Sequence, residues 1–240
     1  SQSDPPLTLP PLSSSILHGG GEGVGASSEL PYLELYVEKM CFWGAYLLSQ
    51  WGVGRALSTD QMDTMAHEAA SLREQQSRAV PTHEALAVIG RHAPIVELGA
   101  GRGLWSSLLS TRGCDIVAYD EEGGEGGDKA GGEAVVRVGG PSVASSHSDR
   151  ALLLIWPDLE GEGTFALDCL AAYSGQTLLL VGEWRGRALS IPYGTAFAPP
   201  FQAAVEADFE VVQQVRLPSW PTFVDVLTVW RRKSAPEAVQ

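Results

Sequence analysis

The hydrophobic pattern of the chain changes near residue 93. Between residues 31 and 51, apolar side chains recur at every third or fourth position, as at Leu33, Val37 and Met40. This spacing is typical of helices with one buried face. Pro31 suits the first turn of a helix, and Asp60 and Thr82 are candidate helix caps. We therefore predict three helices, at about 31–51, 60–78 and 83–90.

After residue 93, short apolar runs alternate with helix-like segments. Most of the runs show no polar–apolar alternation, which is typical of parallel strands covered on both faces. Only a short Pro-containing turn separates the last two runs, so we expect them to pair antiparallel. The predicted strands lie within 94–98, 114–120, 134–138, 150–158, 176–184, 209–218 and 222–232, and the predicted helices within 103–113, 163–175 and 199–208.

These patterns divide the chain into four parts. Residues 1–29 are rich in Pro, Gly and Ser and are predicted to form a flexible arm. Residues 30–92 are predicted to form an N-terminal helical segment or lid, residues 93–233 an α/β domain, and residues 234–240 a tail. The glycine- and acid-rich stretch after Asp120 is predicted to be a mobile loop.

Composition limits the classes of partner. The chain has 29 acidic and 16 basic residues and a formal net charge of −13, which argues against direct nucleic-acid binding. No apolar run approaches the roughly 20 residues of a membrane span. The three cysteines form no CxxC pair, and the histidines lack metal-ligand spacing, so we expect an intracellular protein with reduced thiols and no metal. Because the chain begins at Ser1, an organellar protein that has lost a targeting peptide stays open.

A glycine-rich turn follows the first predicted strand. Gly99, Gly101 and Gly103 come directly after Glu97, where the strand should lead into a helix. The GxGxxG pattern of dinucleotide sites fails because Leu104 occupies the last glycine position, and no GxxxxGK phosphate loop occurs. A nucleoside with a cationic amino-acid part, such as S-adenosylmethionine, is the third alternative. It suits an acid before the glycines and another, Asp120, that ends the next strand.

The same residues carry a family resemblance. "VELGAGRG", followed about twenty residues later by "VAYD", resembles motif I and the next acidic strand end of class I S-adenosylmethionine-dependent methyltransferases. More narrowly, several segments resemble a little-characterised GAGxGxW methyltransferase-like group. The resemblance implies a Rossmann-like α/β fold with a mainly parallel seven-stranded sheet, an antiparallel C-terminal hairpin and additional N-terminal helices.

The resemblance also implies a cofactor, S-adenosyl-L-methionine, and a set of residues that bind it. The methionine part would be bordered by Glu97 and the glycine turn, and the ribose would be held by Asp120. Trp156, at the end of the strand beside motif I, would border the cofactor as well. The turn residues concerned are Gly99, Ala100, Gly101 and Gly103. The family often has an acid or amide that contacts adenine after the third strand, but here "VGGPS" offers only backbone groups and Ser142.

Two acids are candidate catalytic residues. "IWPD" matches the position, though not the letters, of an Asn/Asp-Pro-Pro-aromatic motif in amino-methylating relatives, which makes Asp158 a candidate base. Its alternative role is to cap a helix. Glu183, after the next strand, is the second candidate, and its alternative is a surface ion pair with Arg185 or Arg187. Four arginines have two possible interpretations, a local anion-binding site or ordinary scattered surface charge. They are Arg73, Arg78, Arg102 and Arg112.

Three functional hypotheses follow. The first is an S-adenosylmethionine-dependent methyltransferase that acts on a small-molecule or protein acceptor. The second is a methyltransferase-like scaffold or assembly subunit of a larger protein complex, without catalysis. The third, an NAD-dependent enzyme, is disfavoured by the glycine spacing.

Overall fold

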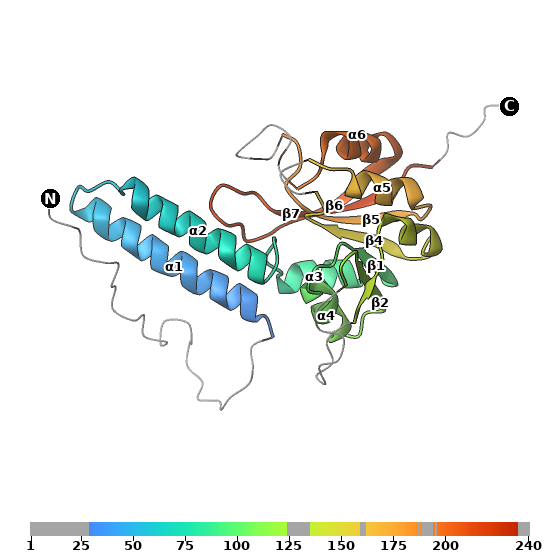
Figure 1. Cartoon of the computed structure of the whole chain (residues 1–240), viewed down its shortest axis with the longest axis horizontal. Helices are drawn as coiled ribbons and strands as arrows, with labels where there is room; N and C mark the ends of the chain where they lie inside the picture. The colour runs from blue at the N-terminus through green and yellow to red at the C-terminus, as the bar shows by residue number, and fades with distance from the viewer. Residues whose placement is uncertain are drawn as a thin grey trace. The chain divides into compact units, whose positions relative to one another are not determined.

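The structure, a computed structural model, describes residues 29–123, 135–158, 162–186, 188, 194 and 196–234 (Figure 1). The chain divides into two compact units, Ser1–Glu68 and Ala69–Gln240. Residues 1–28 of the predicted arm, most of the predicted loop after Asp120 and residues 235–240 of the tail lie outside the described residues. The predicted domain boundary at residue 92 and the lid role of residues 30–92 stay predictions.

Two helices account for the described part of the first unit. Helix α1 spans Pro31–Gly52, and α2 spans Thr59–Gln75, with its residues from Ala69 onward belonging to the second unit. The two helices are joined by an ion pair between Lys39 Nζ and Glu68 Oε2 at 3.2 Å. The Gln61 side chain also donates to the Tyr46 hydroxyl. The two helices predicted from the spacing of apolar residues are confirmed.

The second unit is built on one seven-stranded sheet with the order β3-β2-β1-β4-β5-β7-β6. The strands are β1 Ile95–Leu98, β2 Ile116–Asp120, β3 Val136–Val138, β4 Ala151–Ile155, β5 Thr177–Gly182, β6 Phe209–Arg216 and β7 Val226–Arg232. The first five pair in parallel, whereas β7 runs antiparallel to both β5 and β6. The predicted architecture, a Rossmann-like α/β fold with a mainly parallel seven-stranded sheet and an antiparallel C-terminal hairpin, is confirmed.

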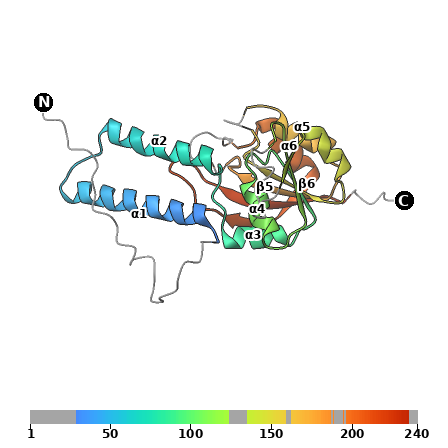
Figure 2. The same ribbon diagram turned by 60° about the horizontal axis from the view of Figure 1, so that its bottom comes forward.

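Helices cover both faces of this sheet (Figures 1 and 2). Helices α3 and α4 lie on one face, and α5 and α6 lie on the other. Their bounds are α3 His83–Gly90, α4 Leu104–Ser110, α5 Phe165–Ala172 and α6 Pro199–Asp208, with a short 3₁₀ helix at Pro141–Ser146. The predicted cap of α3 is present, since the Thr82 hydroxyl accepts a hydrogen bond from the Ala85 N–H at 3.1 Å.

One edge of the sheet collects the ends of several strands. Parallel pairing places the carboxyl ends of β1, β2, β4 and β5 at this edge. Strand β7 runs antiparallel to β5, so the start of β7 lies at this edge as well. Gly182 of β5 pairs with Val226 of β7, and the next residues toward the edge, Glu183 and Asp225, are therefore neighbours. The central strands β1, β4 and β5 are almost entirely buried, and Glu97 is buried within β1.

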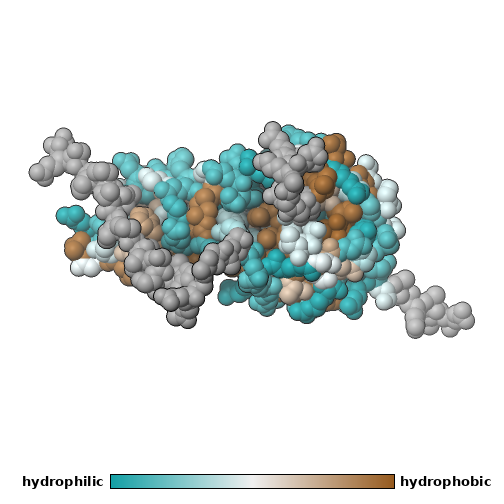
Figure 3. Space-filling model, turned by 90° about the horizontal axis from the view of Figure 1, so that it is seen from below, coloured by the Kyte–Doolittle hydropathy of each residue, from teal (hydrophilic) through white to brown (hydrophobic). Residues whose placement is uncertain are grey.

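The surface carries scattered apolar side chains. Figure 3 shows hydrophobic and hydrophilic residues interspersed on the face that it draws. Leu48, Trp51 and Val53, near the end of α1, are among the exposed large hydrophobic residues. Among the helices of the described ranges, none has the length and apolar content needed to cross a bilayer.

Candidate functional site

The turn after β1 is shaped by glycine. Gly99, Gly101 and Gly103 have φ angles of +71°, +54° and +77°, a region that only glycine adopts without strain. The Ala100 N–H donates to the Tyr119 carbonyl at 3.0 Å, which ties the turn to the end of β2. Gly103 then caps α4. The glycines therefore let the backbone itself form the surface at this strand end.

Asp120 lies beside the turn. Its Oδ2 accepts the Gly101 N–H at 2.8 Å, and its Oδ1 accepts the Glu122 N–H at 3.2 Å. A carboxylate oxygen can accept more than one hydrogen bond, so each oxygen retains capacity for a ligand hydroxyl. The acid that ends β2 is thus held in a fixed orientation next to the glycine turn.

Glu97 is a buried acid with an incomplete set of hydrogen bonds. Its side chain is 2 % exposed, and no hydrogen-bond partner for Oε2 exists in the described part of the chain. Burial raises the pKa of Glu97 to about 8; the hydrogen bond with Ser106 opposes this rise, and the charge of Asp120 adds to it. The carboxyl group is therefore mostly protonated at neutral pH, and a cation placed beside it would favour ionisation.

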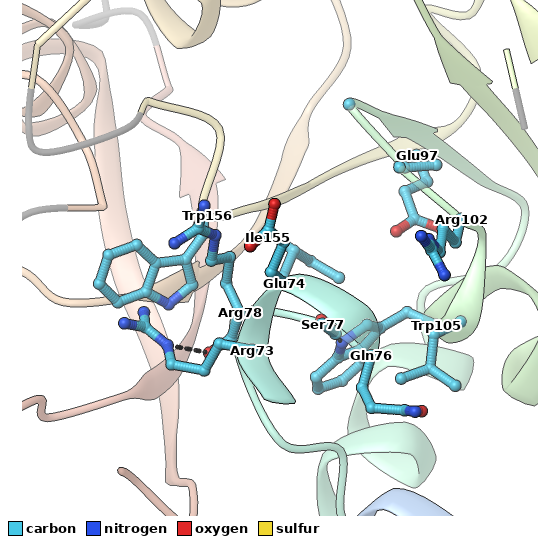
Figure 4. Close-up of a pocket in the computed structure, with 14 residues that line it drawn as sticks. Arg73, Glu74, Gln76, Ser77, Arg78, Glu97, Arg102, Trp105, Ile155 and Trp156 are labelled. Atoms are coloured by element: carbon cyan, nitrogen blue, oxygen red, sulfur yellow. Dashed lines mark hydrogen bonds between the residues drawn. The ribbon is translucent and has the colours of Figure 1, made fainter. Parts of the chain in front are cut away.

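A pocket of about 230 Å³ opens beside Glu97 and the turn (Figure 4). Ligand pockets are commonly about 300–1,000 Å³, so this space suits part of a nucleoside. All of its lining residues belong to the second unit. Five of the seven residues predicted to bind a cofactor line it, namely Glu97, Gly99, Ala100, Gly101 and Trp156. Of the other two, Gly103 is hydrogen-bonded to Ala100, and Asp120 to Gly101.

Three of the four arginines considered as an anion site come together at this pocket. Arg73, Arg78 and Arg102 line it, whereas the Arg112 side chain donates to the Leu108 carbonyl beside the end of α4. Figure 4 shows Arg102 on the same side of the view as Glu97, and Arg73 beside Trp156. The pocket therefore offers guanidinium groups as well as the acid of Glu97, which suits a ligand that carries both charges.

A second group of side chains surrounds Trp156, the residue that follows β4. Its indole Nε1 donates to Asp225 Oδ1 at 2.7 Å, and the Phe223 ring meets it edge-on with 5.4 Å between centroids. The Arg73 guanidinium carbon lies 4.5 Å from the Trp156 ring centroid and 3.6 Å from that of Phe223. The Arg73 Nε also donates to the Arg78 carbonyl at 3.1 Å. The Arg73 cation thus lies over two aromatic rings.

Two buried acids lie next to these rings. Asp225 is 1 % exposed, and burial raises its pKa to about 7; the hydrogen bond from Trp156 and the charge of Arg73 lower it, while the charge of Glu183 raises it. Glu183 is fully buried, and its Oε1 accepts the Val224 N–H at 3.1 Å. The proposed alternative for Glu183, a solvated surface pair, does not fit this burial, and Arg185 pairs with Glu206 instead.

Asp158 is also buried, with both oxygens engaged. Oδ1 accepts the Ala166 N–H at 3.2 Å, in the first turn of α5, and Oδ2 accepts the Ala198 N–H at 2.9 Å, just before α6. These contacts are those of a capping acid, the alternative role that the sequence left open. A catalytic role for Asp158 stays a prediction.

Sequence reasoning missed three contributors to this edge. Phe223 and Asp225 were read only as part of the last strand, and Arg73 as a member of an anion site. The predicted antiparallel hairpin contained a usable signal, because an acid just before its second strand must lie at the same edge as Glu183. Within the described ranges, the structure forms no group of three His, Cys, Asp or Glu side chains suited to a metal ion.

Comparisons with known proteins add the following. No protein-family model matches the sequence, and a search of curated proteins finds no match. Among solved structures, a 1,6-didemethyltoxoflavin-N1-methyltransferase from Burkholderia thailandensis, with bound S-adenosylhomocysteine, is similar at 19 % identity and a TM-score of 0.45, over 88 % of this chain and 94 % of that one.

Two further structures are similar at comparable levels. An O-methyltransferase from Bacillus cereus, in complex with S-adenosylhomocysteine, matches with 11 % identity and a TM-score of 0.45, over 78 % of this chain and 97 % of that one. TehB from Haemophilus influenzae matches with 13 % identity and a TM-score of 0.43, over 64 % of this chain. The aligned part spans 63 % of the length of TehB.

Proposed function

We propose that the chain is an S-adenosylmethionine-dependent methyltransferase that binds its cofactor at the carboxyl ends of β1 and β2. The observation that carries the proposal is Glu97, a buried acid with one oxygen that has no hydrogen-bond partner among the described residues, in the wall of a pocket beside the glycine turn. Burying such a group costs about 1–3 kcal/mol. A ligand that donates a hydrogen bond to it would recover that cost, and a cationic donor would recover more.

The residues present fit the parts of this cofactor. The ammonium group would be held by Glu97, and the carboxylate by the guanidinium groups of Arg78 and Arg102, which line the same pocket. The two ribose hydroxyls would be held by Asp120. NAD is disfavoured by the glycine spacing, because Leu104 stands where a dinucleotide site has its last glycine.

When bound, S-adenosylmethionine supplies a methyl group on a positively charged sulfur. The chain would position a small-molecule or protein acceptor at the adjoining ends of β4 and β5. There Trp156 forms one wall, and the neighbouring acids Glu183 and Asp225 can hold a proton that the acceptor gives up. We keep Glu183 as the proposed base, with Asp225 as its partner. Asp158 would orient the surrounding backbone through its two N–H contacts.

One observation favours the alternative of an inactive scaffold. The Arg73 guanidinium stacks on Trp156 and so fills space beside the proposed acceptor position. In a protein without catalysis, the Arg73 side chain would block the acceptor position permanently. The two alternatives differ in ligand binding, because a scaffold has no need to bind a cofactor.

Calorimetric titration of the purified chain with S-adenosylmethionine, S-adenosylhomocysteine and NAD tests the proposal. We expect the first two to bind and NAD not to bind. Asp120→Ala should weaken binding of S-adenosylhomocysteine by about tenfold or more, since hydrogen bonds to charged groups contribute about 1.5–3 kcal/mol. Asp149→Ala, which removes an exposed acid, is the matched control and should leave binding unchanged. Absence of binding of both adenosyl compounds would favour the scaffold.

A further inference from the structure

The Arg73 side chain lies beside two aromatic rings and near buried acids. Its guanidinium carbon lies over the rings of both Trp156 and Phe223, which are nearly perpendicular to each other, and the residue is 5 % exposed. Guanidinium groups stack on aromatic faces because they are planar and weakly hydrated. The two rings and the two acids beyond them, Glu183 and Asp225, are called the cation site below.

The acids of the cation site favour positive charge. Asp225 lies at hydrogen-bond distance from Trp156, and its second oxygen, Oδ2, is buried with no hydrogen-bond partner among the described residues. Glu183, which is fully buried, acts on Asp225 electrostatically. Two buried acids side by side repel each other, and a cation between the rings relieves that repulsion.

The backbone around the cation site is strained. Trp156 and Thr222 have φ angles of +48° and +77°, and they are the two non-glycine residues of the described ranges with positive φ. Thr222 directly precedes Phe223, so each strained residue sets the position of one ring. Such strain costs about 1–3 kcal/mol per residue and concentrates at ligand sites. The strain therefore shows that the surrounding structure holds the backbone at both rings in a fixed conformation.

We propose that the cation site binds the methyl acceptor, and that the acceptor carries a planar cationic nitrogen group, such as a guanidinium or amidinium, which takes the place of the Arg73 side chain. The inference rests on the proposed function for its link to methyl transfer. The link is spatial: the pocket lined by Gly99 and Gly101 is also lined by Arg73 and Trp156. The donor and the acceptor would therefore meet in one continuous space.

Other acceptor classes fit the cation site less well. A carboxylate or phosphate would face Glu183 and Asp225 at close range, with unfavourable electrostatics. A neutral planar group could stack on the rings but would leave the buried acids without a compensating charge. An alkyl ammonium carries the charge but lacks the planar shape of the Arg73 guanidinium, the group that lies over the two rings.

Binding of N-methylguanidinium to variants of the full chain tests the proposal. Arg73→Ala empties the site, and Arg112→Ala, which removes an arginine outside the pocket, is the matched control. We expect Arg73→Ala to bind the probe at least about tenfold more tightly than the wild type or Arg112→Ala, a difference of about 1.4 kcal/mol. N-methylurea, the neutral analogue of the same shape, should bind at least about tenfold more weakly than the cation. Adding Asp225→Asn to Arg73→Ala should abolish the preference for the cation.

Titration of the same variants with S-adenosylhomocysteine separates this proposal from the proposed function. If Arg73→Ala binds S-adenosylhomocysteine but not N-methylguanidinium, the acceptor proposal is wrong and the cofactor proposal stands. If the probe binds but S-adenosylhomocysteine does not, the cation site stands without its role in methyl transfer. Mutual exclusion of the two ligands would also contradict the acceptor role, because donor and acceptor must be bound together.

A loss of stability in Arg73→Ala would not prevent the test. The measurement is then the melting temperature of this variant in about 10 mM N-methylguanidinium, compared with N-methylurea and with sodium chloride, since a specific ligand stabilises the folded state by mass action. A rise with the cation alone supports the cation site. Equal melting temperatures in all three solutions contradict it.

Discussion

The two halves of the carboxyl edge of the sheet are built in different ways. At the ends of β1 and β2, the backbone of the glycine turn at residues 99–103 forms part of the surface, and side chains from nearby in the sequence, such as Glu97 and Arg102, complete it. At the ends of β4, β5 and β7, the surface is made of side chains from distant parts of the chain, which are Arg73, Trp156, Glu183, Phe223 and Asp225. The first half contains a polar pocket, whereas the second half is packed and is filled by the Arg73 side chain.

Under the proposed function, the first half would bind the cofactor and the second half would bind the acceptor. A backbone surface depends on few side chains, so most substitutions nearby leave it intact. A surface made of five side chains changes its shape and charge with each substitution. We therefore expect substitutions in the second half to affect stability most, and those in the first half to affect ligand binding and pH dependence.

The largest effect is expected at Asp158, which holds the second half together. Asp158→Ala leaves the buried N–H groups of Ala166 and Ala198 without their acceptors, and each such loss costs about 1–3 kcal/mol. Urea unfolding should show a loss of about 3 kcal/mol. Asp168→Ala, which removes an exposed acid ten residues on, should change stability by less than about 1 kcal/mol. Equal stabilities of the two variants would show that Asp158 does not organise this half.

An intermediate effect is expected at Glu97, in the first half. Its pKa is about 8 in the folded chain against an ordinary value of 4.5 for a glutamate, so the folded state holds a proton that the unfolded state releases between these pH values. The free energy of unfolding contributed by Glu97 therefore falls as pH rises from 4.5 to 8. Glu97→Gln should be more stable than the wild type at pH 8, and this advantage should shrink by roughly 2–3 kcal/mol at pH 5.

Chemical unfolding of Glu97→Gln and of Glu84→Gln, which alters an exposed glutamate, at both pH values makes this measurement. The Glu84 variant should follow the wild type at each pH. A stability difference between Glu97→Gln and the wild type that does not vary with pH would mean that Glu97 is ionised in the folded chain.

The smallest effect is expected at Ser77, which lines the pocket in the first half. The Trp105 Nε1 donates to the Ser77 hydroxyl at 3.2 Å. Ser77→Ala should cost about 1 kcal/mol, the usual contribution of one hydrogen bond. Ser71→Ala, which removes an exposed hydroxyl from α2, is the control and should cost less. A loss of several kcal/mol in Ser77→Ala would mean that side chains, and not backbone, shape this half as well.

The fold was predictable because its signals are local. Apolar runs without alternation marked the buried strands, and the short connection after Arg216 fixed the antiparallel hairpin. Thr82 and Pro31 marked helix starts by chemistry that acts within one turn. The order of the strands came from the family resemblance, and the assignment to the GAGxGxW group stays a prediction.

The first half of the site was predictable for the same reason, since Glu97, its glycines and Asp120 lie within 24 consecutive residues. The second half depends on contacts between residues up to 150 positions apart, such as Arg73 with Phe223. No local pattern shows which arginine will stack on which ring. Asp158 illustrates the same limit, because its partner Ala198 lies 40 residues away.

The most direct test of the cofactor proposal measures the protons released when S-adenosylhomocysteine binds. Calorimetry at pH 7 in buffers of different ionisation enthalpy gives this number. We predict release of about one proton by the wild type, because the ligand ammonium should lower the pKa of Glu97 below 7, and no release by Glu97→Gln. Binding without proton release, or the same release by both proteins, would contradict a contact between Glu97 and the cofactor.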